Sequence, residues 1–130
     1  MLDTSTASYL IKGSVPAVDA HIRKLDVTQV SISAITRAEL RFGARRLRGA
    51  TRLTADVERF LSGIYTLPWD EAAADEFANV RVDLERAGLP IGIMDTMIAA
   101  HAKAVNAVLV TNNVKHFQRV KGLAVANWTH

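Results

Sequence analysis

The sequence predicts an α/β protein in which helices cover both faces of a parallel β-sheet. Short segments of strand-like composition alternate with longer helical segments, which is the pattern of parallel strands joined by helices. The chain has 130 residues, 49% of them apolar, and no cysteine. These values fit a single domain spanning residues 1–130, without disulfide bonds, thiolate metal sites or a cysteine nucleophile.

Five short segments are expected to form the strands. They are rich in Val, Ile and Leu or end at a turn signal, as the third does at Pro68. They span residues 1–4, 27–35, 64–67, 107–111 and 123–126. The first is a minimal strand of four residues.

Six helices are expected between these strands. Pro16 lies near the first turn of the second helix, where its fixed φ is tolerated, and Gly88 and Pro90 end the fifth. The sixth carries few charges, so we expect it to be buried. The helices span residues 5–12, 14–25, 36–48, 54–62, 70–87 and 93–105.

No segment suggests export or membrane insertion. The N-terminus lacks a basic start and carries Asp3, unlike a signal peptide, and no apolar run approaches the ~18 residues of a membrane span. We therefore expect a cytoplasmic protein that does not contact membranes.

Charge is unevenly distributed, although the net charge is only +3. Residues 1–53 carry nine basic and four acidic side chains, residues 54–95 carry three and nine, and residues 96–130 carry four and none. Two basic flanks around an acidic middle would attract a polyanion such as a nucleic acid. A solvated helix face would explain the arginines alone equally well.

Three carboxylates and an amide pair are expected to meet at one edge of the sheet. Asp3 closes the first strand, Glu39 lies one turn into the helix after the second strand, and Asp95 begins a nearly apolar helix. Asn113, with its neighbour Asn112, follows the fourth strand. Parallel strands present their carboxyl ends at the same edge, so these side chains could converge there.

Each of these residues also has a purely structural explanation. Asp3 and Asp95 could cap the helices that follow them. Glu39, three residues after Thr36, could complete a capping box. The two asparagines could be ordinary turn residues.

Taken together, the carboxylates favour a metal site. Like charges gathered at a half-buried edge of the sheet repel one another unless a cation offsets them. Oxygen ligands select a hard cation, so the group predicts Mg²⁺ or Mn²⁺. Such a cation could activate a water molecule against a phosphodiester bond.

The histidines give weaker signals. His101 lies on a largely apolar helix, which is typical of a structural histidine. His116 lies near Asn113 and Lys115, which leaves a contact with phosphate or substrate open. A ribonuclease that uses histidines without a metal is the alternative that these residues leave open. Phosphate-binding loops and the serine nucleophile motif are absent.

Four segments follow one another over nearly the whole chain: MLDTSTASYLIKG, SISAITRAELRFGA, IGIMDTMIAAHAKA and VLVTNNVKHFQRVKGLAVANW. Together they resemble PIN-domain proteins, and most of all the VapC-type toxins of bacterial toxin–antitoxin pairs. The resemblance implies a three-layer sandwich with a central five-stranded parallel sheet. It also implies a Mg²⁺- or Mn²⁺-dependent endoribonuclease, often acting on transfer RNA.

Carried over residue by residue, the resemblance places Asp3, Glu39 and Asp95 at the three acidic positions of the family. Asp3 and Asp95 would hold the metal, and Glu39 would be a further ligand or orient the attacking water. Asn113 matches the fourth position, where many relatives have Asp, and would support the metal shell or the substrate phosphate. This amide leaves open whether one or two metals bind.

The resemblance also implies partners. These are a cognate VapB-like antitoxin and a second copy of the chain within a larger toxin–antitoxin complex. The residues expected to contact the RNA backbone are Arg37, Arg41 and Lys115. The alternative is a non-catalytic FitB-like PIN module that acts through a DNA-binding partner.

Overall fold

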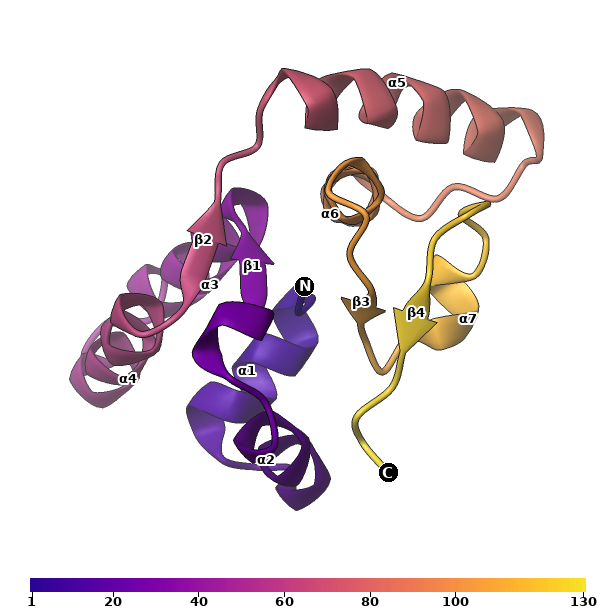
Figure 1. Ribbon diagram of the computed structural model, residues 1–130. Coiled ribbons are helices and arrows are strands. Elements are labelled where there is room, and N and C mark those ends of the chain that lie inside the picture. The colour runs from indigo at the N-terminus through magenta and orange to yellow at the C-terminus, as the bar shows by residue number, and fades with distance from the viewer.

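The computed structural model describes residues 1–130 and contains seven α-helices, one 3₁₀-helix and four short strands (Figure 1). The elements in chain order are α1 (Thr4–Lys12), α2 (Pro16–Arg23), η1 (Val27–Gln29), β1 (Ser31–Ser33), α3 (Ala34–Arg45), α4 (Thr51–Ser62), β2 (Tyr65–Leu67), α5 (Glu71–Arg86), α6 (Ile93–Ala104), β3 (Leu109–Val110), α7 (Val114–Phe117) and β4 (Val125–Ala126). None of the helices has the length and apolar character needed to span a bilayer.

All strand pairings are parallel. β1 pairs with β2, and β3 pairs with β4. Leu2 forms isolated parallel bridges with Ile32 of β1 and with Val110 of β3, so it connects the two pairs. Figure 1 shows the N-terminus between β1 and β3. The predicted α/β class with parallel strands is confirmed.

The apolar core is divided between the two faces of these strands. Met1 and Leu109 belong to a cluster built mainly with α5, α6 and α7. Their neighbours Leu2 and Val110, together with Ile32, belong to a second cluster with α1, α3 and α4. Because successive side chains of a strand point to opposite faces, this alternation places helices on both faces.

The strands are shorter than predicted, and in the first two of them helical turns take up the remaining residues. The strand predicted over residues 27–35 contains only Ser31–Ser33, since Asp26 and Gln29 form a capping box around a 3₁₀ turn. The Ser33 hydroxyl then accepts a hydrogen bond from the backbone N–H of Ile35, so α3 begins at Ala34. The strand predicted over residues 1–4 is reduced to Leu2 because α1 begins at Thr4.

Two further predictions of local structure need correction. The capping box expected between Thr36 and Glu39 is absent, since Ser33 caps α3 and Thr36 lies buried within it. The one-turn helix α7 was not expected, since four residues are too few for a helical period to be recognised. The six longer helices lie where they were predicted, with ends that differ by up to three residues.

Candidate active site

Asp3 lies directly after Leu2, the residue that bridges β1 and β3. Its side chain is nearly buried, with 5% of the residue exposed. Oδ1 accepts a hydrogen bond of 2.8 Å from the backbone N–H of Thr6 and thereby caps α1. The backbone N–H of Asp3 donates to the carbonyl of Val110, which fixes the residue to β3. The capping role expected for Asp3 is therefore confirmed.

Asp95 lies in the first turn of α6 but is not its cap. The N-cap residue is Gly92, whose φ of 90° suits glycine. Asp95 Oδ2 lies 2.9 Å from Nε2 of His116, which belongs to α7. Burial raises the pKa of the Asp95 carboxyl above its ordinary value; the hydrogen bond and charge of His116 lower that pKa, and the charge of Asp3 raises it.

Glu39 is linked to the same edge of the strands through Thr4. The Thr4 hydroxyl donates a hydrogen bond of 2.6 Å to Glu39 Oε1, and it lies 3.2 Å from the hydroxyl of Thr36. Because Thr4 follows Asp3 directly, this bond holds the middle of α3 against the start of α1. Sequence reasoning missed Thr4; its position next to Asp3 at the start of a helix is the only local signal that could have indicated it.

The two asparagines lie at the rim of this edge. Asn113 precedes α7, its backbone N–H donates to the Thr111 hydroxyl at 3.0 Å, and its exposed side chain makes no hydrogen bond within the chain. Asn112 Nδ2 donates to the hydroxyl of Tyr9 at 2.9 Å. Asp3 thus lies near enough to Asp95 to affect its pKa, and Glu39 is linked through Thr4 to the residue after Asp3. We call this polar region the mouth, and Asn113 lies at its border.

The donor set of the mouth fits a hard divalent cation held partly by water. No three Asp, Glu, His or Cys side chains lie close enough to enclose a metal ion. Asp3 Oδ2 and Asp95 Oδ1 have no hydrogen-bond partner within the chain, and no buried side-chain oxygen is left without one. Mg²⁺ uses one or two carboxylates directly and retains several waters, so oxygens of this type are ligands that it accepts.

The basic residues predicted to contact RNA differ in whether their side chains are already bound within the chain. Both terminal oxygens of Glu58 accept hydrogen bonds from the Arg41 guanidinium, at 2.9 and 3.0 Å. Arg37 donates to the Thr66 hydroxyl at 3.2 Å. Lys115 is exposed on α7 and makes no ion pair.

His101 has the structural role expected for it. It is buried, and its Nδ1 lies 2.7 Å from the hydroxyl of Ser33, at the end of β1. Burial lowers the pKa of His101, and the charge of Asp70 opposes this. His101 is therefore part of the packing beneath the mouth.

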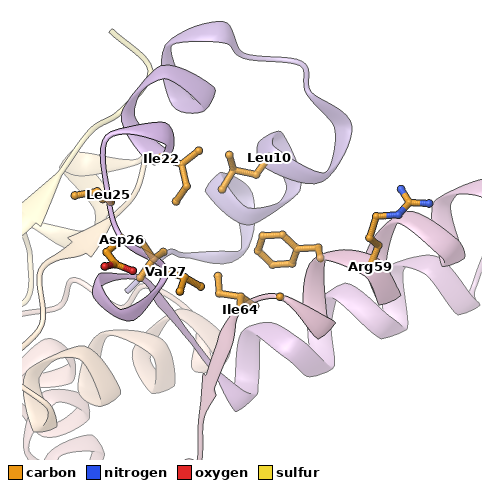
Figure 2. Close-up of a pocket in the computed structure, with 10 residues that line it drawn as sticks. Leu10, Ile22, Leu25, Asp26, Val27, Arg59 and Ile64 are labelled. Carbon is orange, nitrogen blue, oxygen red and sulfur yellow. The ribbon is translucent and has the colours of Figure 1, made fainter.

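An apolar groove lies at the other end of β1 and β2 (Figure 2). Leu10, Ile22, Val27, Phe60 and Ile64 supply most of its walls, and its volume is about 420 Å³. It contains none of the carboxylates of the mouth, and its only charged lining residues are Asp26 and Arg59.

Residues 1–123 match the model of the PIN domain family. The chain is 38% identical to the "tRNA(fMet)-specific endonuclease VapC" of Salmonella typhimurium, with 98% of this chain and 96% of the relative covered. A solved structure of DNA-bound VapBC from Salmonella typhimurium superposes with a TM-score of 0.92 at 37% identity, covering 98% and 96% of the two chains. FitAcB from Neisseria gonorrhoeae superposes with a TM-score of 0.88 at 31% identity, covering 99% and 97%.

These similarities extend over nearly the full length of the chain and of its relatives. The chain belongs to the PIN-domain family and, within it, to the VapC ribonuclease toxins of VapBC toxin–antitoxin systems. The resemblance stated from the four sequence segments is thereby confirmed, as is the ribonuclease function that it implied.

Proposed function

We propose that this toxin is an endoribonuclease that hydrolyses transfer RNA, and that Asp3 and Asp95 hold the Mg²⁺ or Mn²⁺ ion on which cleavage depends. One observation carries the proposal. The charge of Asp3 contributes to raising the pKa of Asp95, and each carboxylate has one oxygen fixed by a hydrogen-bond donor of the chain and one oxygen free. A cation shared by the two free oxygens would offset this repulsion.

The fold supports this arrangement. Joined in the order β2, β1, Leu2, β3, β4, the strand segments would act as one five-stranded parallel sheet in a single three-layer domain. The carboxyl ends of all five segments would then lie at one edge, where parallel α/β folds place their active sites.

The residues of the mouth have separable roles in this proposal. Mg²⁺ bound there would lower the pKa of a water molecule and offset negative charge on the scissile phosphate. Glu39, held by Thr4 through Oε1, would ligate through Oε2 or orient the attacking water. Asn113, whose amide is free, would support the metal shell or a phosphate oxygen. Lys115 and Arg37 would contact the RNA backbone, and Arg41 would do so after leaving Glu58.

The first RNA to test is tRNA(fMet), because the Salmonella relative carries that specificity in its name. Purified toxin, free of any antitoxin, would be incubated with tRNA(fMet) and with an elongator methionine tRNA. Each reaction would contain Mg²⁺, Mn²⁺ or chelator, with Asp3→Asn and Asp95→Asn alongside. We expect discrete fragments with 5′-phosphate ends that disappear with chelator and in both variants.

Other outcomes would redirect the assignment. Cleavage that persists in chelator and leaves cyclic phosphates would overturn the metal mechanism in favour of histidine chemistry. No cleavage of any tRNA by folded protein would favour the non-catalytic, FitB-like alternative, for which FitAcB is the structural precedent.

We also propose a cognate antitoxin and a homodimer as the assembly in the cell. Solved structures of relatives from Rickettsia felis and Salmonella typhimurium contain VapBC bound to DNA. Co-expression with the product of an adjacent small reading frame should relieve growth inhibition by the toxin. Sedimentation of the purified toxin would measure whether it is a dimer.

A further inference from the structure

The contact between His116 and Asp95 includes a third group that determines which atom carries the proton. His116 Nε2 lies 2.9 Å from Asp95 Oδ2 and also 2.9 Å from the backbone carbonyl of Ile91. A carbonyl oxygen can only accept, so Nε2 must carry a hydrogen. His116 Nε2–H therefore donates one three-centre hydrogen bond that both oxygens accept.

The histidine is itself held in place by α7 and its surroundings. The next residue, Phe117, is 1% exposed and anchors α7 in the core, with its ring edge-on to the imidazole at 5.3 Å. Arg119 Nη1 donates to the carbonyl of Pro90 at 3.1 Å. Arg119 and His116 thus hold successive carbonyls, at Pro90 and Ile91, in the segment that leads into α6.

These contacts divide the two oxygens of Asp95 between two tasks. Oδ2 is engaged by His116, whereas Oδ1 has no partner within the chain. Asp3 shows the same division, because Thr6 engages its Oδ1 and leaves Oδ2 free. For Asp3 the fixed donor is the backbone of its own helix. For Asp95 it is a side chain 21 residues away in sequence, which a substitution can remove.

We infer that His116 is a positioning residue that orients the Asp95 carboxylate for the divalent cation; this rests on the proposed function. His116 touches neither RNA nor cation in this role. Hydrogen bonds to a ligating carboxylate fix its orientation, and their loss typically lowers metal affinity by roughly 10-fold to 100-fold. This assignment replaces the contact with phosphate that the sequence left open for His116.

The test measures cation binding directly, without RNA or turnover. Mn²⁺ affinity would be determined by electron paramagnetic resonance or calorimetry for the wild type, His116→Leu and His116→Gln. We expect His116→Leu to bind Mn²⁺ roughly 10-fold to 100-fold more weakly. His116→Gln retains an N–H donor at about the position of Nε2, so it should restore most of the affinity. In cleavage assays, the Mg²⁺ concentration for half-maximal rate should rise in His116→Leu while KM for tRNA stays unchanged.

Arg119→Ala is the matched control. It removes a contact to the same segment, at Pro90, but none to Asp95. If His116 merely holds the segment in place, Arg119→Ala should weaken Mn²⁺ binding as much as His116→Leu does, and the inference is overturned. If His116→Leu does not fold, His116→Asn, whose shorter side chain cannot reach Asp95, takes its place in every comparison.

Asp3→Asn separates failure of this inference from failure of the proposed function. If the wild type and Asp3→Asn bind Mn²⁺ equally, the mouth is not the cation site and the proposed function fails together with the inference. If Asp3→Asn loses binding while His116→Leu binds like the wild type, the cation site stands and the role of His116 alone is wrong.

Discussion

The two ends of β1 and β2 have opposite characters. At the amino end, apolar side chains such as Ile22, Phe60 and Ile64 line the groove of Figure 2. At the carboxyl end, the mouth gathers Asp3, Asp95 and Glu39, each with one oxygen held by a hydrogen bond. The residues directly before β1 and β2, Val30 and Ile64, line the groove, whereas the carboxylates of the mouth come from Asp3 after Leu2, from α3 and from α6.

The residues that stabilise the fold and the residues proposed for catalysis therefore lie at different ends of the strands. The groove residues Leu10, Ile22, Phe60 and Ile64 are half-buried and pack against a core cluster, so they contribute to stability through burial. In the mouth, burial raises the pKa of Asp95 and outweighs the opposing hydrogen bond from His116, so the ionised Asp95 carboxylate costs stability. We therefore expect variants at the two ends to have opposite effects on activity and on stability.

The largest effect is expected for Asp95→Asn, which should lower the rate of tRNA cleavage by roughly 100-fold or more. Removal of a single active-site group typically lowers the catalytic rate by about this factor. Its melting temperature at neutral pH should equal or exceed that of the wild type. The raised pKa shows that the fold disfavours the charge, and the amide oxygen can still accept the bond from His116. Single-turnover cleavage and thermal melts would measure the two effects.

A fall in melting temperature of more than about 5 °C in Asp95→Asn would contradict this separation. The lost activity would then reflect a damaged fold. The carboxyl end would, in that case, contribute to stability as the amino end does.

A substitution in the groove should have the opposite effect, with lower stability and unchanged activity. Phe60→Ala removes a half-buried ring, and we expect it to lower the free energy of unfolding by about 1–3 kcal/mol in urea titrations. Cleavage per folded molecule should not change. Phe42→Ala is the matched control, because the Phe42 ring is 68% exposed and its loss should leave unfolding unaffected. A Phe60→Ala variant of wild-type stability but low activity would reverse the comparison.

The contrast between the two ends also shows what could be predicted from the sequence. The positions of the six longer helices follow from periodicity and cap residues, and the cap at Asp3 from its place before a helix. The lengths of the strands were overestimated, since strand pairing depends on neighbours in space. In the first predicted strand, Leu2 alone pairs, with Ile32 and with Val110. The 3₁₀ turn at Val27–Gln29 could have been recognised, since Asp26 and Gln29 have the spacing of a capping box.

The residues of the candidate site could be proposed from the sequence, but their contacts could not. Asp3, Glu39 and Asp95 were indicated by their places after strands or at helix starts. The partners that hold them, Thr4 and His116, come from other elements, 35 and 21 residues away from Glu39 and Asp95. Such pairs depend on tertiary packing, which one sequence does not reveal.

A smaller effect is expected beneath the mouth, at His101. Burial lowers its pKa, so the folded chain keeps His101 neutral at pH values where the unfolded chain binds a proton. Stability should therefore decrease as pH falls below about 6.5, the ordinary value for histidine, until the folded group titrates as well. Urea unfolding at several pH values should show this slope in the wild type and a shallower one in His101→Gln. His130→Gln, at an exposed histidine, is measured alongside as a matched substitution.

The smallest effect on stability is expected for Arg41→Gln, on the outer surface of α3. Arg41 and Glu58 join α3 to α4 through two hydrogen bonds, yet both side chains are substantially exposed, so solvent screens the pair. Loss of this ion pair should not shift the melting midpoint measurably.

tRNA binding then tests whether Arg41 contacts RNA, because Glu58→Gln frees the guanidinium while Arg41→Gln removes it. If Arg41 contacts the RNA backbone, Glu58→Gln should bind tRNA more tightly and Arg41→Gln more weakly, with a shallower dependence on salt. Equal affinity in both variants would limit Arg41 to its contact with α4 and leave Lys115 and Arg37 as the basic residues still proposed to contact RNA.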